Sequence, residues 1–283
     1  METKINGLVI KGVGGRFTVQ TAEGIIVCPA KGTFRRDNDV ILVGDKVELT
    51  KDHDWLITRV YPRKNSLVRP PVANIDLLVL VLASEPEPDY TLLDKLLLVC
   101  FKNNIDIIVC VNKSDLNNSV YDYVQSVYVE FVKVYKVSAK NGDGLDELTS
   151  QFKGNVCFAG QSAVGKTSLL NTLCSTDEQT GELSKILRGR NTTRHVQIYK
   201  VNDECNLIDT CGFSMFQAGL PARAEISSYY PDFAKQGQCK YRSCMHVTEP
   251  GCCIREAVKQ RKIDLERYYR YLGIIGVQRK WNK

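Results

Sequence analysis

The sequence lacks an apolar run long enough to cross a bilayer, since its longest, residues 77–83, falls far short of the roughly 20 residues that a membrane helix needs. Its N-terminal segment METKINGLVI also lacks the apolar stretch and small-residue cleavage site of a secretory signal. Internal repeats and low-complexity tracts are absent as well. We therefore expect a cytosolic globular protein, and a length of 283 residues suggests two or three modules.

Disulfide bonds are not expected either, because they form in oxidising compartments and we see no export signal. Three of the eleven cysteines lie in apolar runs, where thiols usually pack as small hydrophobes: Cys100, Cys110 and Cys157. Four others are bunched near the C-terminus: Cys239, Cys244, Cys252 and Cys253. Only this second group suggests a metal site.

Positive charge is concentrated in residues 254–283, where nine basic and three acidic side chains give an excess equal to the +6 of the whole chain. The basic residues are Arg255, Lys259, Arg261, Lys262, Arg267, Arg270, Arg279, Lys280 and Lys283. Such an excess favours a polyanion partner, because each neutralised phosphate releases counterions. A solvated helix with a basic face explains the pattern equally well.

Residues 1–66 contain five short strand-like segments, at 8–10, 16–20, 24–28, 46–49 and 55–60, separated by glycine and charged turns. This pattern predicts a small closed β-barrel, for which the OB type is common. Such barrels bind RNA through one face and its loops, and Lys31, Arg35 and Arg36 fall in a long loop. A purely structural barrel is the alternative.

Residues 67–217 alternate apolar strands, at 77–82, 105–111, 134–137 and 156–159, with segments of helical spacing such as 92–101. Near-continuous apolar strands between helices predict a parallel sheet covered on both faces. Residues 218–283 are predicted to be mainly helical, with one helix around 254–272.

The segment GQSAVGKT, residues 160–167, follows an apolar strand and opens a helix, as a phosphate-binding P-loop requires. Glycines let backbone N–H groups turn toward the phosphates, and the helix N-terminus adds its positive dipole end. We expect Lys166 to bridge the β- and γ-phosphates and the Thr167 hydroxyl to ligate Mg²⁺.

Two further loops predict guanine recognition. Residues 112–115 read NKSD after a strand, and the Asp115 carboxylate can accept both donors on the guanine edge, which adenine lacks. NKSD alone is a weak match, but Ser138, Ala139 and Lys140 follow the next strand and offer a backbone N–H to the guanine carbonyl.

Residues 209–212, DTCG, place Asp209 on the Mg²⁺ side and the Gly212 N–H at the γ-phosphate. The polar stretch 189–195 before it is the natural first switch, in which Thr192 or Thr193 closes on Mg²⁺, with a slight preference for Thr193. The order of the motifs is permuted, because the guanine loops precede the P-loop. The switches consequently join directly to the third module.

The third module contains Cys239-x4-Cys244-x-His246-x5-Cys252, three thiols and an imidazole suited to structural zinc. A turn at residues 249–251 would fold the last ligand back toward the others. Cys253 competes with Cys252, but we expect it to point elsewhere on a tight turn.

A barrel, a permuted GTPase and a Cys₃His module together resemble the bacterial ribosome small-subunit-dependent GTPase A family over the whole chain. The resemblance implies three domains: an OB-type β-barrel at 1–66, a circularly permuted α/β P-loop GTPase at 67–217 and a mainly helical zinc-binding module with a basic tail at 218–283. It also implies a cytoplasmic monomer with one zinc ion, which binds the small (30S) subunit and 16S ribosomal RNA, acts in late subunit maturation and hydrolyses GTP when stimulated by that subunit. The sequence departs from the family at Ala163, usually glycine, and at Cys211, usually proline.

Catalysis has one weak point, because Phe213 stands where many GTPases have a glutamine that orients the attacking water. We therefore predict slow intrinsic hydrolysis. Arg190 and Arg194 would contact RNA phosphates or supply charge in cis, and His195 would position water or contact RNA. The rival function is a GTP-switched RNA-binding module in which hydrolysis is incidental. A signalling GTPase is the other alternative, but we see neither a lipidation signal nor an amphipathic anchor in the sequence.

The residues expected to bind GTP are Asn112, Lys113, Ser114, Asp115, Ser138, Ala139, Lys140, Gly160, Gln161, Ser162, Ala163, Val164, Gly165, Lys166, Thr167 and Ser168. Catalysis is assigned to Lys166, Thr193, Asp209 and Gly212, and Mg²⁺ binding to Thr167 and Thr193.

Overall fold

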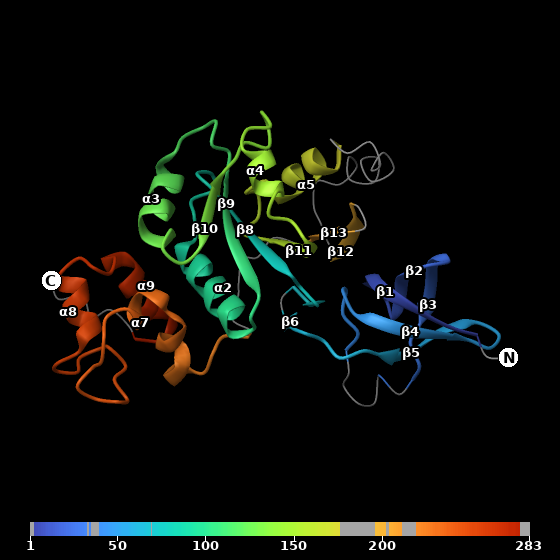
Figure 1. Cartoon of the computed structure of the whole chain (residues 1–283), viewed down its shortest axis with the longest axis horizontal. Helices are drawn as coiled ribbons and strands as arrows, with labels where there is room; N and C mark the ends of the chain where they lie inside the picture. Colours follow the sequence, from blue (N-terminus) through green and yellow to red (C-terminus); the bar gives the residue numbers. More distant parts are fainter. Residues whose placement is uncertain are drawn as a thin grey trace.

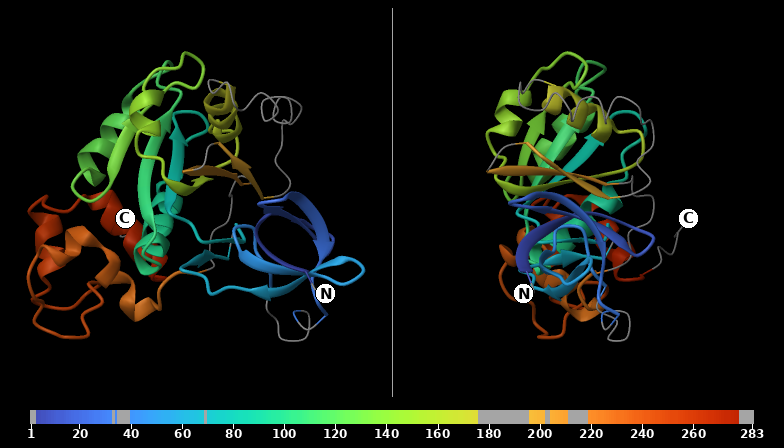
Figure 2. Two further views of the ribbon diagram at one scale, coloured as in Figure 1. Left: turned by 45° about the vertical axis from the view of Figure 1, so that its right-hand side comes forward. Right: turned by 90° about the vertical axis from the view of Figure 1, so that its right-hand side faces the viewer.

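Five strands near the N-terminus close into a barrel in the computed structural model, which describes residues 3–32, 34, 40–68, 70–175, 196–201, 204–210 and 219–277. They are β1 (Thr3–Val13), β2 (Arg16–Thr21), β3 (Gly24–Pro29), β4 (Lys46–Lys51) and β5 (Trp55–Val60). Antiparallel pairing links β3 to β2, β2 to β1, β1 to β4 and β4 to β5. A parallel bridge between Ala30 and Ile57 joins the end of β3 to β5 and completes the circle (Figure 2).

Alternation along these strands builds the barrel core, because residues two apart point to the same side. Val9, Val19, Val47, Leu49 and Ile57 are fully buried inside. The predicted OB-type barrel is confirmed. A short hairpin of β6 (Ser66–Leu67) and β7 (Val72–Ala73) follows it.

The central sheet is parallel in the order β10-β9-β8-β11-β13. Its strands are β8 (Leu77–Ala83), β9 (Asp106–Asn112), β10 (Lys133–Lys136), β11 (Gly154–Ala159) and β13 (Cys205–Asp209). Helices α2 (Tyr90–Lys102) and α3 (Ser119–Tyr128) cover one face, while α4 (Leu145–Thr149) and α5 (Lys166–Ser175) cover the other (Figure 1). Every residue of β8 is buried, as the continuous apolar run predicts.

The barrel and the central sheet are hydrogen-bonded to each other, which the sequence did not predict. Strand β12 (Gln197–Lys200) pairs antiparallel with β13 on one side and with β1 of the barrel on the other, where Gln197 lies opposite Lys11. A single path of paired strands therefore runs from the barrel into the central sheet.

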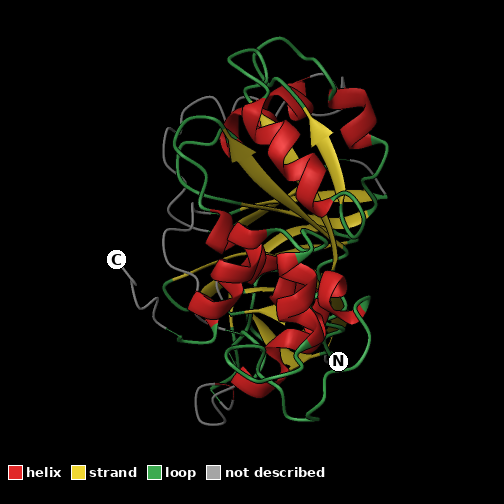
Figure 3. Ribbon diagram, turned by 90° about the vertical axis from the view of Figure 1, so that its left-hand side faces the viewer, coloured by secondary structure: helices red, strands yellow, loops and turns green. Residues whose placement is uncertain are grey.

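The C-terminal part is mainly helical, as predicted, and lies on the far side of the central sheet from the barrel (Figures 1 and 3). It contains a 3₁₀ helix η2 (Arg223–Tyr229) and helices α7 (Pro231–Ala234), α8 (Cys253–Lys259) and α9 (Leu265–Ile274). The single helix predicted around 254–272 is wrong, because the chain turns at Arg261, whose φ is +58°. Asp264 then caps α9 by accepting from the Arg267 N–H at 2.8 Å.

A buried ionic network joins this part to the central domain. Asp94 of α2, fully buried, accepts from both Arg267 and Arg270 of α9, and the Arg270 Nε lies 2.6 Å from its carboxylate. The Tyr128 hydroxyl donates to the same carboxylate at 2.9 Å. Burial lowers the pKa of Arg267, but Asp94 and Asp232 outweigh burial and raise it above its usual range. Two of the nine basic residues counted in the C-terminal segment are therefore internal ion-pair partners and not a free RNA-binding surface.

Among the helices of the described ranges, none combines the length and the apolar character needed to cross a bilayer.

Candidate functional site

The predicted nucleotide-binding loops meet at one edge of the central sheet. NKSD begins at the last residue of β9, Ser138 follows β10, the P-loop follows β11, and Asp209 ends β13. These four strands are parallel, so their carboxyl ends lie at the same edge, where open α/β sheets bind ligands. The permuted order along the chain leaves this convergence intact.

The P-loop backbone adopts conformations that favour glycine at three positions. Gly160 has φ +141° and passes so close to the Val81 carbonyl that a Cβ would clash with it. Gly165 has φ +95° and packs against the Asn112 amide in the same way. Ala163 has φ +65°, so the departure noted in the sequence falls at a left-handed position where a Cβ is unfavourable.

Lys166, the predicted phosphate-bridging lysine, is 6% exposed at the start of α5. Its Nζ donates to the carbonyl oxygens of Gly160 at 3.0 Å and of Gln161 at 2.6 Å. The ammonium group is thereby held within the loop whose N–H groups are expected to surround the phosphates. Ser162 and Ser168 are exposed on either side of this loop, and Val164 is buried beneath it.

Asn112 holds the base loops and the P-loop together. Its Nδ2 donates to the Val164 carbonyl at 3.0 Å, and its Oδ1 accepts from the Ala139 N–H at 3.0 Å. The side chain is 2% exposed. Its geometry therefore indicates a residue that positions three loops.

Asp115 is presented at the same edge by Ser138, whose Oγ donates to its carboxylate at 2.8 Å. Asp115 and Lys140 are exposed, whereas Ser114 is half-buried. Lys113, at φ +61°, donates to the Glu85 carbonyl at 2.6 Å. The carboxylate is oriented and accessible to a base.

The segment 85–89, between β8 and α2, belongs to this site and was missed in the sequence. The Gln161 side chain accepts from the Asp89 N–H at 2.9 Å and donates to the Glu87 carbonyl at 3.1 Å. Asp89 also caps α2 through the Leu92 N–H at 2.9 Å. No motif marks this acidic, proline-containing stretch, so only the fold reveals that α2 begins against the P-loop.

The predicted Mg²⁺ side is described in part. Thr167 is half-buried in the first turn of α5, and Asp209 is 2% exposed at the end of β13, the strand beside β11. Thr210 donates to the Phe158 carbonyl at 2.5 Å and fixes the two strand ends together. The remaining predicted residues of this side lie outside the described part of the chain: Arg190, Thr192, Thr193, Arg194, His195, Cys211, Gly212 and Phe213. Arg35 and Arg36 of the barrel loop lie outside it too.

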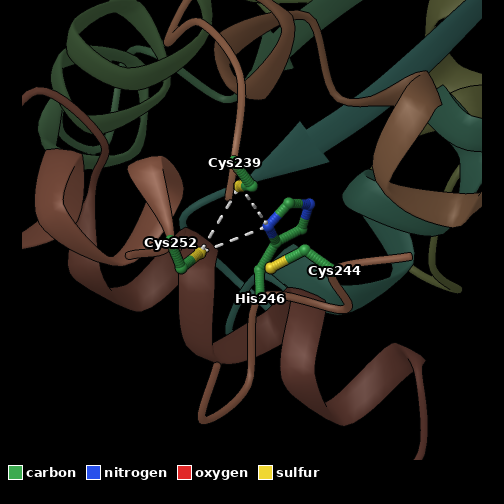
Figure 4. A group of neighbouring side chains, drawn as sticks. All are labelled: Cys239, Cys244, His246 and Cys252. Carbon is green, nitrogen blue, oxygen red and sulfur yellow. Dashed lines mark hydrogen bonds between the residues drawn. The ribbon is translucent and has the colours of Figure 1, made fainter. Parts of the chain in front are cut away.

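Cys239, Cys244, His246 and Cys252 converge on one point (Figure 4), and their donor atoms all lie within 4.8 Å of one another. The His246 Nδ1 is 3.5 Å from the Cys239 sulfur and 3.3 Å from the Cys252 sulfur, and those two sulfurs are 3.9 Å apart. Bonds of about 2.3 Å to one tetrahedral ion place thiolates roughly 3.8 Å apart. The cluster can therefore hold a metal ion.

Neighbouring groups fix the loop that carries this cluster. The Glu249 carboxylate accepts from the N–H groups of Met245 and Val247 at 2.8 and 2.7 Å. Tyr268 donates to the His246 carbonyl at 2.7 Å from α9. Burial lowers the pKa of His246, which favours the neutral imidazole that a metal ligand requires.

Cys253 does not point away from the cluster, so that expectation is wrong. Its sulfur lies 3.2 Å from the Cys239 sulfur and 3.5 Å from the Gly237 carbonyl. The turn places Cys252 and Cys253 on the same side of the chain, next to Cys239.

Comparison with known proteins agrees with this architecture. The sequence model of the RsgA N-terminal domain matches residues 6–55, and that of the RsgA GTPase matches residues 60–219. The small ribosomal subunit biogenesis GTPase RsgA of Caldanaerobacter subterraneus is 41% identical over 283 residues, covering 96% of this chain and 95% of that protein. Its Clostridium beijerinckii counterpart is 37% identical, with 95% of each chain covered.

Two solved structures are also similar over most of the chain. YjeQ from Thermotoga maritima matches with a TM-score of 0.78 and 32% identity, covering 96% of this chain and 98% of YjeQ. YloQ, described as a circularly permuted GTPase, matches with a TM-score of 0.72 and 29% identity, covering 96% and 94%. These matches confirm the permuted fold read from the motif order, and this GTP-hydrolysing chain belongs to the RsgA GTPase family.

Proposed function

We propose that this chain is a GTP-dependent assembly factor of the small ribosomal subunit, which binds 16S ribosomal RNA and acts late in maturation. The observation that carries the proposal is the place of the nucleotide site within the fold. Its sheet pairs with the barrel through β12, and α2, which begins against the P-loop, is ion-paired to the C-terminal module through Asp94. The relatives named as small ribosomal subunit biogenesis GTPases support this choice of partner.

In the proposed complex, the Asp115 carboxylate accepts from the two donors on the guanine edge, and a backbone N–H of the loop 138–140 donates to the guanine carbonyl. The Ser138 bond that orients the carboxylate at 2.8 Å supports this role. A base without those donors would cover the carboxylate and leave it with the Ser138 bond alone, which disfavours adenine strongly.

Hydrolysis is assigned to groups that position and neutralise phosphate oxygens, because phosphoryl transfer depends mainly on electrostatic stabilisation. Lys166 would leave its two loop carbonyls for the β- and γ-phosphates, and the Gly212 N–H would contact the γ-phosphate. Thr167 and Thr193 would hold Mg²⁺, with Asp209 behind them, and the ion neutralises charge on the phosphates when bound. Phe213 offers no group to orient water, so we propose slow turnover until the ribosomal subunit supplies the missing contacts.

The RNA-binding surface is proposed to include both flanking modules. On the barrel, Lys31 is exposed in the loop after β3. On the C-terminal module, exposed basic side chains occur around α7 and α8: Lys235, Lys240, Arg242, Lys259, Arg261 and Lys262. Phosphate contacts from such side chains make affinity fall steeply with salt.

The resident metal of the C-terminal module is proposed to be zinc, held by Cys239, Cys244, His246 and Cys252. Three thiols and one imidazole with tetrahedral spacing fit a closed structural site, in which the ion holds the loop in place. The proposed protein is therefore a monomeric, cytoplasmic factor that carries one zinc ion and acts on the small ribosomal subunit.

The proposal is tested by measuring phosphate release from GTP with and without purified small subunits. We expect slow turnover alone and stimulation by the subunit, with Lys166→Ala inactive in both conditions. Lys153→Ala is the matched control, since this exposed lysine lies before β11 at the opposite end from the P-loop. Fast turnover by the isolated protein would contradict the proposal.

Sedimentation of subunits with bound protein tests the switch. We expect co-sedimentation with a non-hydrolysable GTP analogue and release with GDP. Equal association in both nucleotide states would show that the γ-phosphate does not control binding.

A further inference from the structure

A fourth sulfur lies against the three sulfurs and one imidazole of the metal cluster. Cys253 is 3.2 Å from the Cys239 sulfur, closer than the 3.9 Å between the ligand sulfurs of Cys239 and Cys252. The four donors already complete a tetrahedral set, and Cys253 is outside that group. Its thiol is therefore available for chemistry of its own.

Cys253 is accessible to small solutes as well as close to the Cys239 sulfur. Its side chain is partly exposed, and its sulfur is held toward Cys239 by a contact of 3.5 Å with the Gly237 carbonyl. A cavity of about 490 Å³ is lined by Cys253 together with Cys239, Cys244 and His246. A small solute entering this cavity reaches the two neighbouring sulfurs directly. Outside this module, the cysteines whose side chains the structure describes are buried: Cys28, Cys100, Cys110, Cys157 and Cys205.

We propose that Cys239 and Cys253 form a peroxide-sensitive thiol pair, whose oxidation to a disulfide removes one ligand from the metal cluster. The inference rests on the proposed zinc site, because loss of the ion is its consequence. A disulfide needs the sulfurs about 2.05 Å apart, so they must approach by roughly an ångström.

The chemistry balances with one hydrogen peroxide as the oxidant. The Cys253 sulfur attacks a peroxide oxygen, the O–O bond breaks, and the departing oxygen takes the thiol proton and leaves as water. The Cys239 sulfur, which is a thiolate while it holds the metal, then attacks the sulfur of the resulting sulfenic acid and the S–O bond breaks. The departing hydroxide takes a proton from solvent and leaves as a second water. The two sulfurs lose two electrons in total, and the peroxide gains them.

The cluster cannot keep its closed set after this step, because Cys239 no longer offers a thiolate. Cys239 connects the segment after α7 to the remaining ligands at 244–252. Oxidation would therefore release the ion and free that segment from the rest of the module.

The test uses the full chain purified with its metal and freed of reductant. Metal content is measured first. A protein without zinc would contradict the zinc site of the proposed function, and this outcome is kept separate from the result of the thiol oxidation. Hydrogen peroxide is then added, released zinc is followed with a chromogenic chelator, and remaining thiols are blocked before tryptic mapping.

The sequence makes the mapping specific. Cleavage after lysine and arginine places Cys239 in residues 236–240 and the other three cysteines in residues 243–255. Fragmentation between Cys252 and Cys253 then identifies the linked partner. We expect a Cys239–Cys253 link, restored thiols after dithiothreitol, and zinc release at least tenfold slower in Cys253→Ser.

Under reducing conditions, Cys253→Ser and Cys253→Ala should both retain the zinc content of the parent. Loss of zinc from both would make Cys253 a ligand and overturn the proposal. Zinc release at the parental rate in either variant, or a link from Cys239 to Cys244 or Cys252, would overturn it as well.

Discussion

The buried network between α2 and α9 offers a quantitative test of how the C-terminal module is attached. Asp94→Ala removes a carboxylate with no exposed surface that accepts from Arg267, Arg270 and Tyr128. Removing one partner of a buried ion pair costs about 3–5 kcal/mol, because the other charge stays in the interior without compensation. Arg267 keeps Asp232, whose carboxylate lies 3.0 Å from its Nε, so we expect the lower end, about 3 kcal/mol.

Hydrogen exchange measured by mass spectrometry separates this local effect from global unfolding. A loss of about 3 kcal/mol corresponds to roughly hundredfold faster exchange of protected amides in α9, while peptides of the barrel strands keep their rates. Lys235→Ala is the control, because it removes the exposed Lys235–Glu130 pair, which also joins the C-terminal part to the central domain. It should leave α9 unchanged. A change of less than about threefold in Asp94→Ala would refute the view that this network holds the module in place.

Three further predictions concern the loops. Asp115→Asn should weaken GDP binding at least a hundredfold and create affinity for xanthosine diphosphate, whose C2 carbonyl can accept from the new amide; unchanged GDP titrations would contradict guanine recognition by Asp115. Ala163→Gly should raise the free energy of unfolding in urea by up to about 1 kcal/mol, because Ala163 has a φ of +65°. The control Ala257→Gly, inside α8, should lower it. A lower free energy of unfolding for Ala163→Gly would refute backbone strain at Ala163. Burial acts to raise the pKa of Glu249, but the backbone N–H groups lower it overall. The stabilisation by the ionised Glu249 carboxylate is therefore fully present above about pH 4.3 and is lost as the pH falls through the lower folded-state pKa. We expect the thermal unfolding temperatures of Glu249→Gln and the parent to converge as the pH falls through that pKa. A difference that stays constant with pH would exclude the effect.

The chemistry of the nucleotide loops was readable from the sequence because each motif is local. Residues 160–167 carry their own strand, loop and helix signals, and any parallel sheet brings the ends of neighbouring strands to one edge. The metal cluster was readable for a related reason, since its four donors fall between residues 239 and 252 and a short loop can bring them together. The buried cysteines also followed from their apolar neighbours.

Side-chain partners that are distant along the chain were not readable in this way. Arg267 and Arg270 looked like members of a basic tail, but α9 packs on α2 and turns them toward Asp94, more than 170 residues earlier. Likewise, nothing in residues 85–89 or in β12 signals that they meet the P-loop and the barrel.

The sequence by itself determined the ligand chemistry, the permuted order of the loops and the metal donors, because those depend on residue type and short spacing. Only the tertiary structure decided which charges are internal, which sulfur lies beside Cys239 and how the three parts are joined. Those features depend on the packing of segments far apart in the chain, where a small rotation of a turn or helix exchanges one partner for another.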